Sequence, residues 1–281
     1  MWLFFSVLAG AFYTGESLVL RYILRQQKDA WAFSFFYSVV GALISLPFML
    51  RAPVVPHGVG IWALAMLMGL LIVGSNLLMF KASNHLEASL IGTFSKLRLV
   101  WVFILGVVLL HAPFSWQELG GTVLAIAAGL VIMHNFKRPN SSAGISLVLW
   151  ATLFTASIII LTKYLLGSFN VGSLTFFVTF FPAVIFNFIF MPHAAARIKK
   201  LFKEDWPVVL PACSFGTFAN LALNQALSLH DASGVLVINE VFLILVLVGE
   251  HIFLKEKEYL WVKLLSVALA IAGAIIIEIH F

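Results

Sequence analysis

Charged side chains are scarce in this chain. Only 10% of its 281 residues are Asp, Glu, Lys or Arg, and 62% are hydrophobic. A soluble domain typically carries about 25% charged residues, so this chain has too little polar surface for a water-soluble fold. Apolar runs of about 20 residues, long enough to cross a bilayer as helices, recur from end to end. These runs do not fit the pattern of a transmembrane barrel, whose strands are about 10 residues long and alternate in polarity.

Cysteine and the common catalytic motifs are nearly or wholly missing. Cys213 is the single cysteine, so no disulfide forms within the chain. The sequence has neither a phosphate-binding GxxxxGK[ST] motif nor an HExxH zinc motif. Its net charge of +5 is modest, and the basic residues lie mostly between apolar runs, where topology signals belong. We therefore expect no cofactor, no metal and no nucleic acid, and we expect the lipid bilayer to surround the chain.

Ten apolar runs follow one another, and we predict that each forms a membrane-spanning helix. Polar segments separate them, for example KRPNSSAG after the fifth run. The predicted helices cover residues 2–20, 31–50, 59–80, 88–110, 117–134, 144–165, 172–191, 206–227, 232–254 and 260–279. The predicted fold class is an all-α membrane protein with ten transmembrane helices.

The two halves of the sequence resemble each other, which indicates an internal duplication. A shift of 144 residues places Trp62 on Trp206 and Asn76 on Asn220. Near the start of each half, a shift of 142 residues places LRYIL on TKYLL. Five predicted helices lie on each side of KRPNSSAG, so the duplicated unit has five helices.

An odd number of helices in each unit has a consequence for topology. The second unit must enter the membrane from the opposite side, which gives an inverted repeat with a pseudo-twofold axis in the membrane plane. We predict a first five-helix repeat over 1–136, a linker loop over 137–143 and a second repeat over 144–281. Inverted repeats are typical of transporters, whose substrate site lies at the repeat interface near the midplane.

Basic residues lie mostly on one side of the predicted helices. Only Arg51 and Lys163 lie by the loops of the other side. The positive-inside rule then places both termini on the non-cytoplasmic side, and we expect a bacterial inner membrane. Thirteen basic residues lie by the loops after odd-numbered helices: Arg21, Arg25, Lys28, Lys81, Lys137, Arg138, Arg197, Lys199, Lys200, Lys203, Lys255, Lys257 and Lys263.

The whole chain resembles the drug/metabolite transporter superfamily, specifically its ten-span EamA-type members. The resemblance rests on the duplication, on NHLEASLIGTFSKLRLVWVF and LHDASGVLVINEVFLILVLVGEHIFLKE, and on the closing helices GGTVLAIAAGLVIM and LLSVALAIAGAIII. Val241 and Leu97 depart from the family pattern, which often has proline after the acidic residue of the ninth helix. The resemblance implies a central cavity lined by helices one, three and four and their mates six, eight and nine. It also implies alternating access with small metabolites as substrates.

Lys96 lies in the middle of the fourth predicted helix, and the shift of 144 residues places it on Glu240 of the ninth. The pseudo-twofold axis would bring the two residues to similar depth on facing helices. A charge at the bilayer centre costs about 2.5–3.5 kcal/mol and usually faces a partner or a wet cavity. We therefore expect Lys96 to face Glu240 or a substrate beside it. An ion pair that only holds the two halves together is the other interpretation.

Other polar and aromatic residues are candidates for the same cavity. Arg98 lies two residues after Lys96, and Glu16 of the first helix is its expected partner. The repeat mates Asn76 and Asn220 are candidate hydrogen-bonding residues; packing between helices is the alternative role. The remaining candidates are Asn239, Gln225, Tyr13 and Trp101.

Together these features predict a secondary transporter and not an enzyme. Cations and carboxylates in one cavity suit a zwitterion, such as an amino acid or a derivative, and we predict its export. Protons are the expected coupling ion if transport is coupled. The alternatives are an organic or phosphorylated anion, a lipid-linked metabolite, or a membrane-embedded enzyme or assembly factor.

Overall fold

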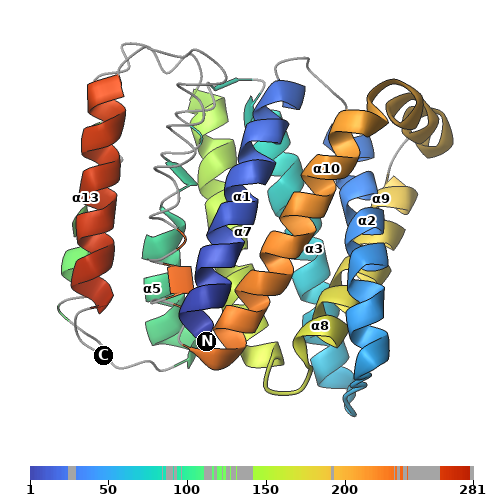
Figure 1. The fold of residues 1–281 in the computed structure, drawn as a ribbon, viewed down its shortest axis with the longest axis horizontal. Helices are drawn as coiled ribbons and strands as arrows, with labels where there is room; N and C mark the ends of the chain where they lie inside the picture. Colours follow the sequence, from blue (N-terminus) through green and yellow to red (C-terminus); the bar gives the residue numbers. More distant parts are fainter. Residues whose placement is uncertain are drawn as a thin grey trace.

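The computed structural model describes most of the chain, and the statements below concern its described part alone. That part comprises residues 1–24, 30–83, 85–86, 91, 94–95, 97–110, 116, 119–121, 123–124, 127, 131, 142–190, 193–230, 232, 235–236, 239 and 260–278. The described elements are all helices (Figure 1).

The helices of the first half follow the predicted apolar runs. Three long helices come first, and a shorter one coincides with the second part of the fourth run. Their bounds are α1 (Trp2–Leu24), α2 (Ala30–Arg51), α3 (Val59–Ser83) and α5 (Arg98–Leu110). The fifth predicted helix contains only scattered described residues, so it stays a prediction.

The second half repeats this order. The seventh predicted helix is divided in three, because a π-helical turn interrupts it around Pro182. The bounds are α7 (Ser142–Leu165), α8 (Val171–Val178), η1 (Thr179–Val184), α9 (Ile185–Phe190), α10 (Ala194–Leu229) and α13 (Leu260–Glu278). Most of the ninth predicted helix lies outside the described residues.

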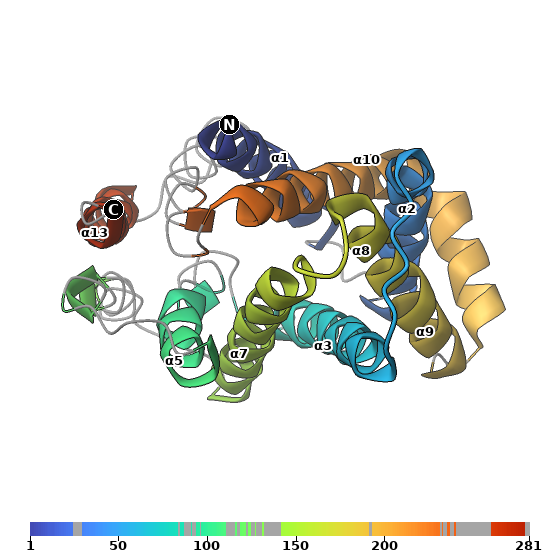
Figure 2. The ribbon, with the colours of Figure 1, turned by 90° about the horizontal axis from the view of Figure 1, so that it is seen from below.

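One predicted loop is wrong. The charged segment that precedes Trp206 was expected to connect two spans, but it is helical from Ala194 and continues into α10. Pro207 and Pro211 lie inside this helix, and each removes a backbone hydrogen bond, which bends helices. Figures 1 and 2 show the first turns of α10 at the edge of the bundle beside α2 and α9, at a steep angle to the rest of the helix.

Within the described residues, five helices are long and apolar enough to cross a membrane. Each coincides with a predicted span, so these five predictions agree with the structure in place and length. Their apolar stretches are Trp2–Val19, Trp31–Arg51, Val59–Ala82, Ala143–Leu165 and Trp206–Leu229. Shorter apolar helices cover Arg98–Leu109 and Val171–Val184.

The most extensive helix pairings join the two halves: α1 packs along α10, and α3 packs along α7. Both pairs are antiparallel. Trp2 at the start of α1 stacks on His230 at the end of α10, and Ser75 and Met68 of α3 contact Thr155 and Thr162 of α7. A twofold relation that exchanges α1 with α7 and α3 with α10 turns one pair into the other.

The directions of the helices agree with this exchange. In Figure 1, α1 and α3 run upward, whereas α7 and the long part of α10 run downward. Each helix therefore runs opposite to its sequence mate, as an inverted repeat requires.

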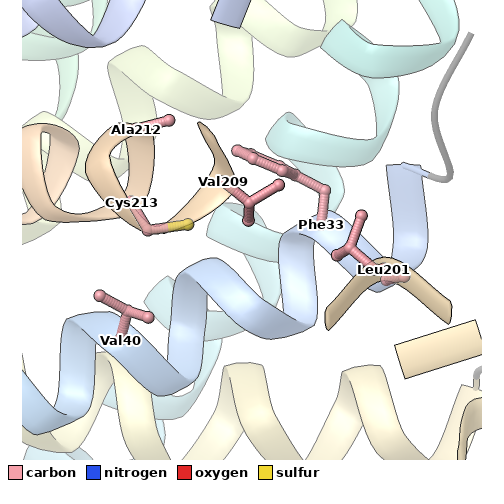
Figure 3. Packing of buried hydrophobic residues seen from close by; sticks show 7 residues of the cluster. Phe33, Val40, Leu201, Val209, Ala212 and Cys213 are labelled. Atoms are coloured by element: carbon pink, nitrogen blue, oxygen red, sulfur yellow. The ribbon is translucent and has the colours of Figure 1, made fainter. Parts of the chain in front are cut away.

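The core between α2 and α10 joins the bent start of α10 to its membrane span. Figure 3 shows Phe33 of α2 beside Val209 and Leu201 of α10, with Cys213 further along the same helix. These side chains are buried, so α10 is fixed to α2 on both sides of its bend.

Lys163 caps the C-terminal end of α10. It is one of the two basic residues predicted on the non-cytoplasmic side. Its Nζ donates hydrogen bonds to the carbonyl oxygens of Leu227, at 2.9 Å, and His230, at 2.8 Å. The last carbonyls of a helix have no partner within it and carry partial negative charge, so an ammonium group stabilises this end.

Candidate functional site

A chain of polar side chains crosses the junction of α1, α2 and α10. The hydroxyl of Tyr13 donates to Asn220 Oδ1 at 2.8 Å, and Asn220 Nδ2 donates to the hydroxyl of Tyr37 at 3.0 Å. The Tyr37 hydroxyl in turn donates a hydrogen bond to the carboxylate of Glu16. Four side chains from three helices thus form one network between two spans of the first half and one of the second.

The helical repeat explains how these groups meet. Tyr13 and Glu16 are three residues apart on α1, so they share one face. On α10, Gly216 and Asn220 are four residues apart and also share a face, and Asn220 Nδ2 donates to the Gly216 carbonyl oxygen at 2.9 Å. We call the network of Tyr13, Glu16, Tyr37 and Asn220 the polar junction.

Gly216 makes room for the polar junction. A Cβ atom at this position would overlap Glu16 Oε1 and the Tyr37 hydroxyl oxygen. The bare backbone of α10 therefore lies directly against the carboxylate and the phenol. Glycine is needed here for its small size, since its φ is not in the left-handed region.

Charges of both signs act on the polar junction. The phenol of Tyr13 interacts electrostatically with the carboxylate of Glu16 and with the guanidinium of Arg98, which is the first residue of α5. All three side chains are partly buried. The site therefore offers a cation, a carboxylate, an amide and two phenols, which is suitable for binding a small molecule with both an ammonium and a carboxylate group, or for holding a proton.

The structure brings together four of the residues predicted from sequence: Tyr13, Glu16, Arg98 and Asn220. The expected direct Glu16–Arg98 ion pair stays a prediction. Glu16 takes a hydrogen bond from Tyr37, and Tyr13 lies within electrostatic reach of both charges.

Other candidates lie apart from the polar junction. Gln225 Nε2 donates to Ser228 Oγ one turn along the surface of α10. Trp101 packs against an apolar cluster that includes Leu99 and Leu236. Asn76 is partly buried on α3 and, among the described residues, has no hydrogen bond to the junction.

Asn239 retains a buried acceptor. Its Nδ2 donates to the Val235 carbonyl oxygen at 3.0 Å. Its Oδ1 is buried and receives no hydrogen bond from the described residues. Lys96 and Glu240, the central pair of the sequence interpretation, lie outside the described residues.

Sequence reasoning missed Tyr37 and Gly216. Tyr37 is the one tyrosine of its apolar run, and a buried tyrosine hydroxyl usually has a hydrogen-bond partner. This signal could have drawn attention to Tyr37, but nothing in the sequence says which partner it meets. The sequence does not distinguish Gly216 from the other glycines in predicted helices, because its importance depends on Glu16 and Tyr37, which lie on other helices.

A comparison with known protein families finds one match in each half of the chain. The sequence pattern of the EamA-like transporter family matches residues 1–134 and again residues 142–279. The chain belongs to the EamA-like transporter family. It is accordingly a multi-pass membrane protein of the drug/metabolite transporter type, as the resemblance of the sequence implied.

Other comparisons bear on the fold alone. A solved structure titled only "Crystal structure of protein" aligns with 98% of this chain and 99% of its own length, with a TM-score of 0.63 and 13% sequence identity. At that identity the likeness concerns the helical architecture. A comparison with curated proteins gave no match.

The two EamA-like repeats differ at the position of the polar junction. The shifts of 142 and 144 residues place Tyr13 on Thr155 and Asn220 on Asn76. Where Tyr13 bonds Asn220 in one pair of helices, Thr155 Oγ1 lies 2.9 Å from Ser75 Oγ, next to Asn76, in the other. The same shifts place Glu16 on Ile158.

Proposed function

We propose that this EamA-like protein is a secondary transporter that moves a small zwitterionic metabolite, such as an amino acid or a derivative, by alternating access. One observation carries the proposal: the carboxylate of Glu16 lies against Gly216 and the Tyr37 hydroxyl, beside the Tyr13–Asn220 hydrogen bond, at an interface between helices of the two repeats. Charged side chains in membrane helices are costly and usually mark substrate or proton pathways.

Each residue of the site has a role in the proposal. The Arg98 guanidinium binds the carboxylate of the substrate, since guanidinium groups form strong charge-assisted bonds with carboxylates. Glu16 meets the ammonium group of the substrate, or carries a proton when the substrate is absent. Tyr37 positions Glu16 through its hydrogen bond, and Asn220 links Tyr37 to Tyr13.

Residues of the fourth and ninth helices extend this site. We further propose that Lys96 and Glu240, which lie outside the described residues, face each other or a substrate between them, as their repeat equivalence predicts. Asn239 Oδ1, a buried acceptor, is available to a substrate ammonium or hydroxyl. Buried polar atoms without a partner are uncommon and call for one.

Topology completes the proposal. Ten spans form two inverted repeats in a bacterial inner membrane, with both termini outside and transport in the export direction. Support comes from the antiparallel mates and from α13, which ends on the side where α1 begins (Figure 1). A C-terminal fusion to a protein that fluoresces only in the cytoplasm is expected to stay dark, and bright fluorescence would contradict the orientation.

A ligand screen on the purified protein tests the substrate class. Amino acids and their derivatives are expected to raise the melting temperature in proportion to ln(1 + [L]/Kd), whereas sugar phosphates and organic anions do not. The variant Glu16→Gln is expected to lose this shift. The control Gln225→Ala, which changes a side chain outside the junction, is expected to keep it. Stabilisation by phosphates alone would contradict the zwitterion assignment.

A further inference from the structure

The first turns of α10 form an amphipathic helix at the end of a candidate membrane span. We call residues 194–206 the basic arm. The arm is continuous with the candidate span that begins at Trp206. Figure 1 shows the arm nearly end-on and Figure 2 shows it along its length, so it lies at the level of the span ends, at the edge of the bundle beside α2 and α9. Such a helix lies along the membrane surface, where headgroups are.

One side of the basic arm packs against the protein. Leu201 is buried and Ile198 is partly buried in the core shared with α2. The ring of Phe202 lies 5.9 Å from that of Phe36 on α2. These contacts fix how the arm is rotated about its axis, and therefore which side chains it turns outward.

The opposite side carries exposed lysines. Lys199, Lys200 and Lys203 are all exposed. At 100° per residue, Lys199 and Lys203 lie within about 40° of each other on the helix. The arm contains four basic residues, Arg197 and the three lysines, and two acidic residues, Glu204 and Asp205, so its formal charge is +2.

Apolar rings border the lysines. Phe202 and Trp206 are 56% and 49% exposed, and both fall between the lysines and the buried side on the helix. Aromatic rings beside lysines are typical of helices at the headgroup level, where the rings enter the acyl region and the ammonium groups reach the phosphates.

From this arrangement we infer that the basic arm is a binding surface for the headgroups of anionic phospholipids. The charge is complementary, and the arm lies at the depth of the phosphates. A cluster of basic residues at the membrane surface attracts anionic lipids. Because the arm continues into the helix that carries Gly216 and Asn220, bound lipid would hold the end of that helix in place.

Lipid titration of the full-length protein tests the inference. The purified protein in a neutral detergent is titrated with phosphatidylglycerol or with phosphatidylcholine of the same acyl chains, and bound lipids are counted by native mass spectrometry. Phosphatidylglycerol is expected to bind more tightly. The double variant Lys199→Gln/Lys203→Gln is expected to weaken its binding about 25-fold, since each basic residue near an anionic surface contributes about five-fold.

Two control variants distinguish the effect of the arm lysines on lipid binding from the effects of net charge and of misfolding. Arg51→Gln/Lys81→Gln removes two other exposed charges and is expected to bind phosphatidylglycerol like the wild type. Lys199→Arg/Lys203→Arg keeps the charges and is expected to keep the binding. An equal loss in the Arg51/Lys81 variant, or no loss in the arm variant, would overturn the inference. Displacement of the lipid by inorganic phosphate at equal concentration would also overturn it, because the site would then bind free anions.

Discussion

The two antiparallel helix pairs, α1 with α10 and α3 with α7, occupy equivalent places in the repeats but have opposite chemistry. In the first pair, Glu16 lies against Gly216. The repeat shifts place these residues on Ile158 and Ile72 of the second pair, and both isoleucines pack against an apolar cluster. The two interfaces are therefore equivalent in the repeats, but among the described residues only the α1–α10 interface carries a carboxylate with a partner network.

The hydrogen bonds of the two pairs differ in the same sense. In the α3–α7 pair, Ser75 and Thr155 bond each other, and Ser75 also donates to the Ala151 carbonyl oxygen at 3.3 Å. Such short-range hydroxyl bonds join helices that approach closely. The α1–α10 pair instead uses the longer side chains of Tyr13 and Asn220, which bond each other at 2.8 Å. We interpret the α3–α7 pair as structural and the α1–α10 pair as functional.

The largest expected effect concerns Lys96 and Glu240, which the repeat equivalence predicts to face each other. Removing one partner of a buried ion pair typically costs about 3–5 kcal/mol, so Lys96→Met and Glu240→Gln are each expected to destabilise strongly. The double variant is expected to recover much of the loss. Unfolding in detergent, measured for the full double-mutant cycle, checks this.

Contacting residues normally couple by about 0.5–3 kcal/mol, so strictly additive losses would show that Lys96 and Glu240 do not meet. Transport separates the two roles of the pair. If the double variant folds but stays inactive, at least one residue acts on substrate or protons. Restored transport would mean that the pair only holds the repeats together.

A smaller effect is expected at Gly216. Gly216→Ala introduces a methyl group that overlaps Glu16 and Tyr37, and overpacking of this kind costs about 1–3 kcal/mol. The transport rate is expected to fall by more than the loss of stability alone would cause, because in the proposed mechanism the carboxylate must move. Gly106→Ala is the matched control, because a Cβ at Gly106 meets nothing within 4 Å. Equal activity in both variants would contradict the role of the junction.

The smallest expected effect compares the two hydrogen-bonded pairs directly. Tyr13→Phe and Thr155→Val each remove a hydroxyl that bonds another helix. Such bonds contribute about 0.6 kcal/mol on average in membrane proteins, so both variants are expected to lose similar stability. Only Tyr13→Phe is expected to lower the affinity for substrate. A matching loss of affinity in Thr155→Val would remove the distinction between the repeats.

Much of this fold could be predicted from the sequence because bilayer thickness sets helix length. The runs that become α1, α2, α3 and α7 have few charges and clear ends, so their places agree with the structure. The basic arm was missed because its charges and Pro207 look like a connecting loop. Packing of Leu201 against α2 outweighs that local signal.

The candidate site was only partly predictable for a similar reason. Tyr13, Glu16 and Asn220 are polar groups in apolar helices, which marks them in the sequence. Gln225 has the same character, but it lies five residues after Asn220 and is rotated by about 140° on the helix. Tyr37 was missed because its partners come from two other helices, and only their packing decides which hydroxyl meets the carboxylate.

The central claim is that the carboxylate at the α1–α10 junction acts on substrate, while the equivalent α3–α7 pair only packs. Exchange of a radiolabelled substrate in proteoliposomes tests it most directly, with Glu16→Gln and Ser75→Ala/Thr155→Val reconstituted at equal density. The account predicts that Glu16→Gln lowers exchange by at least about 100-fold, comparable to the loss of a general acid or base, while the Ser75/Thr155 variant stays within about three-fold of wild type. Near-normal exchange by Glu16→Gln would contradict it.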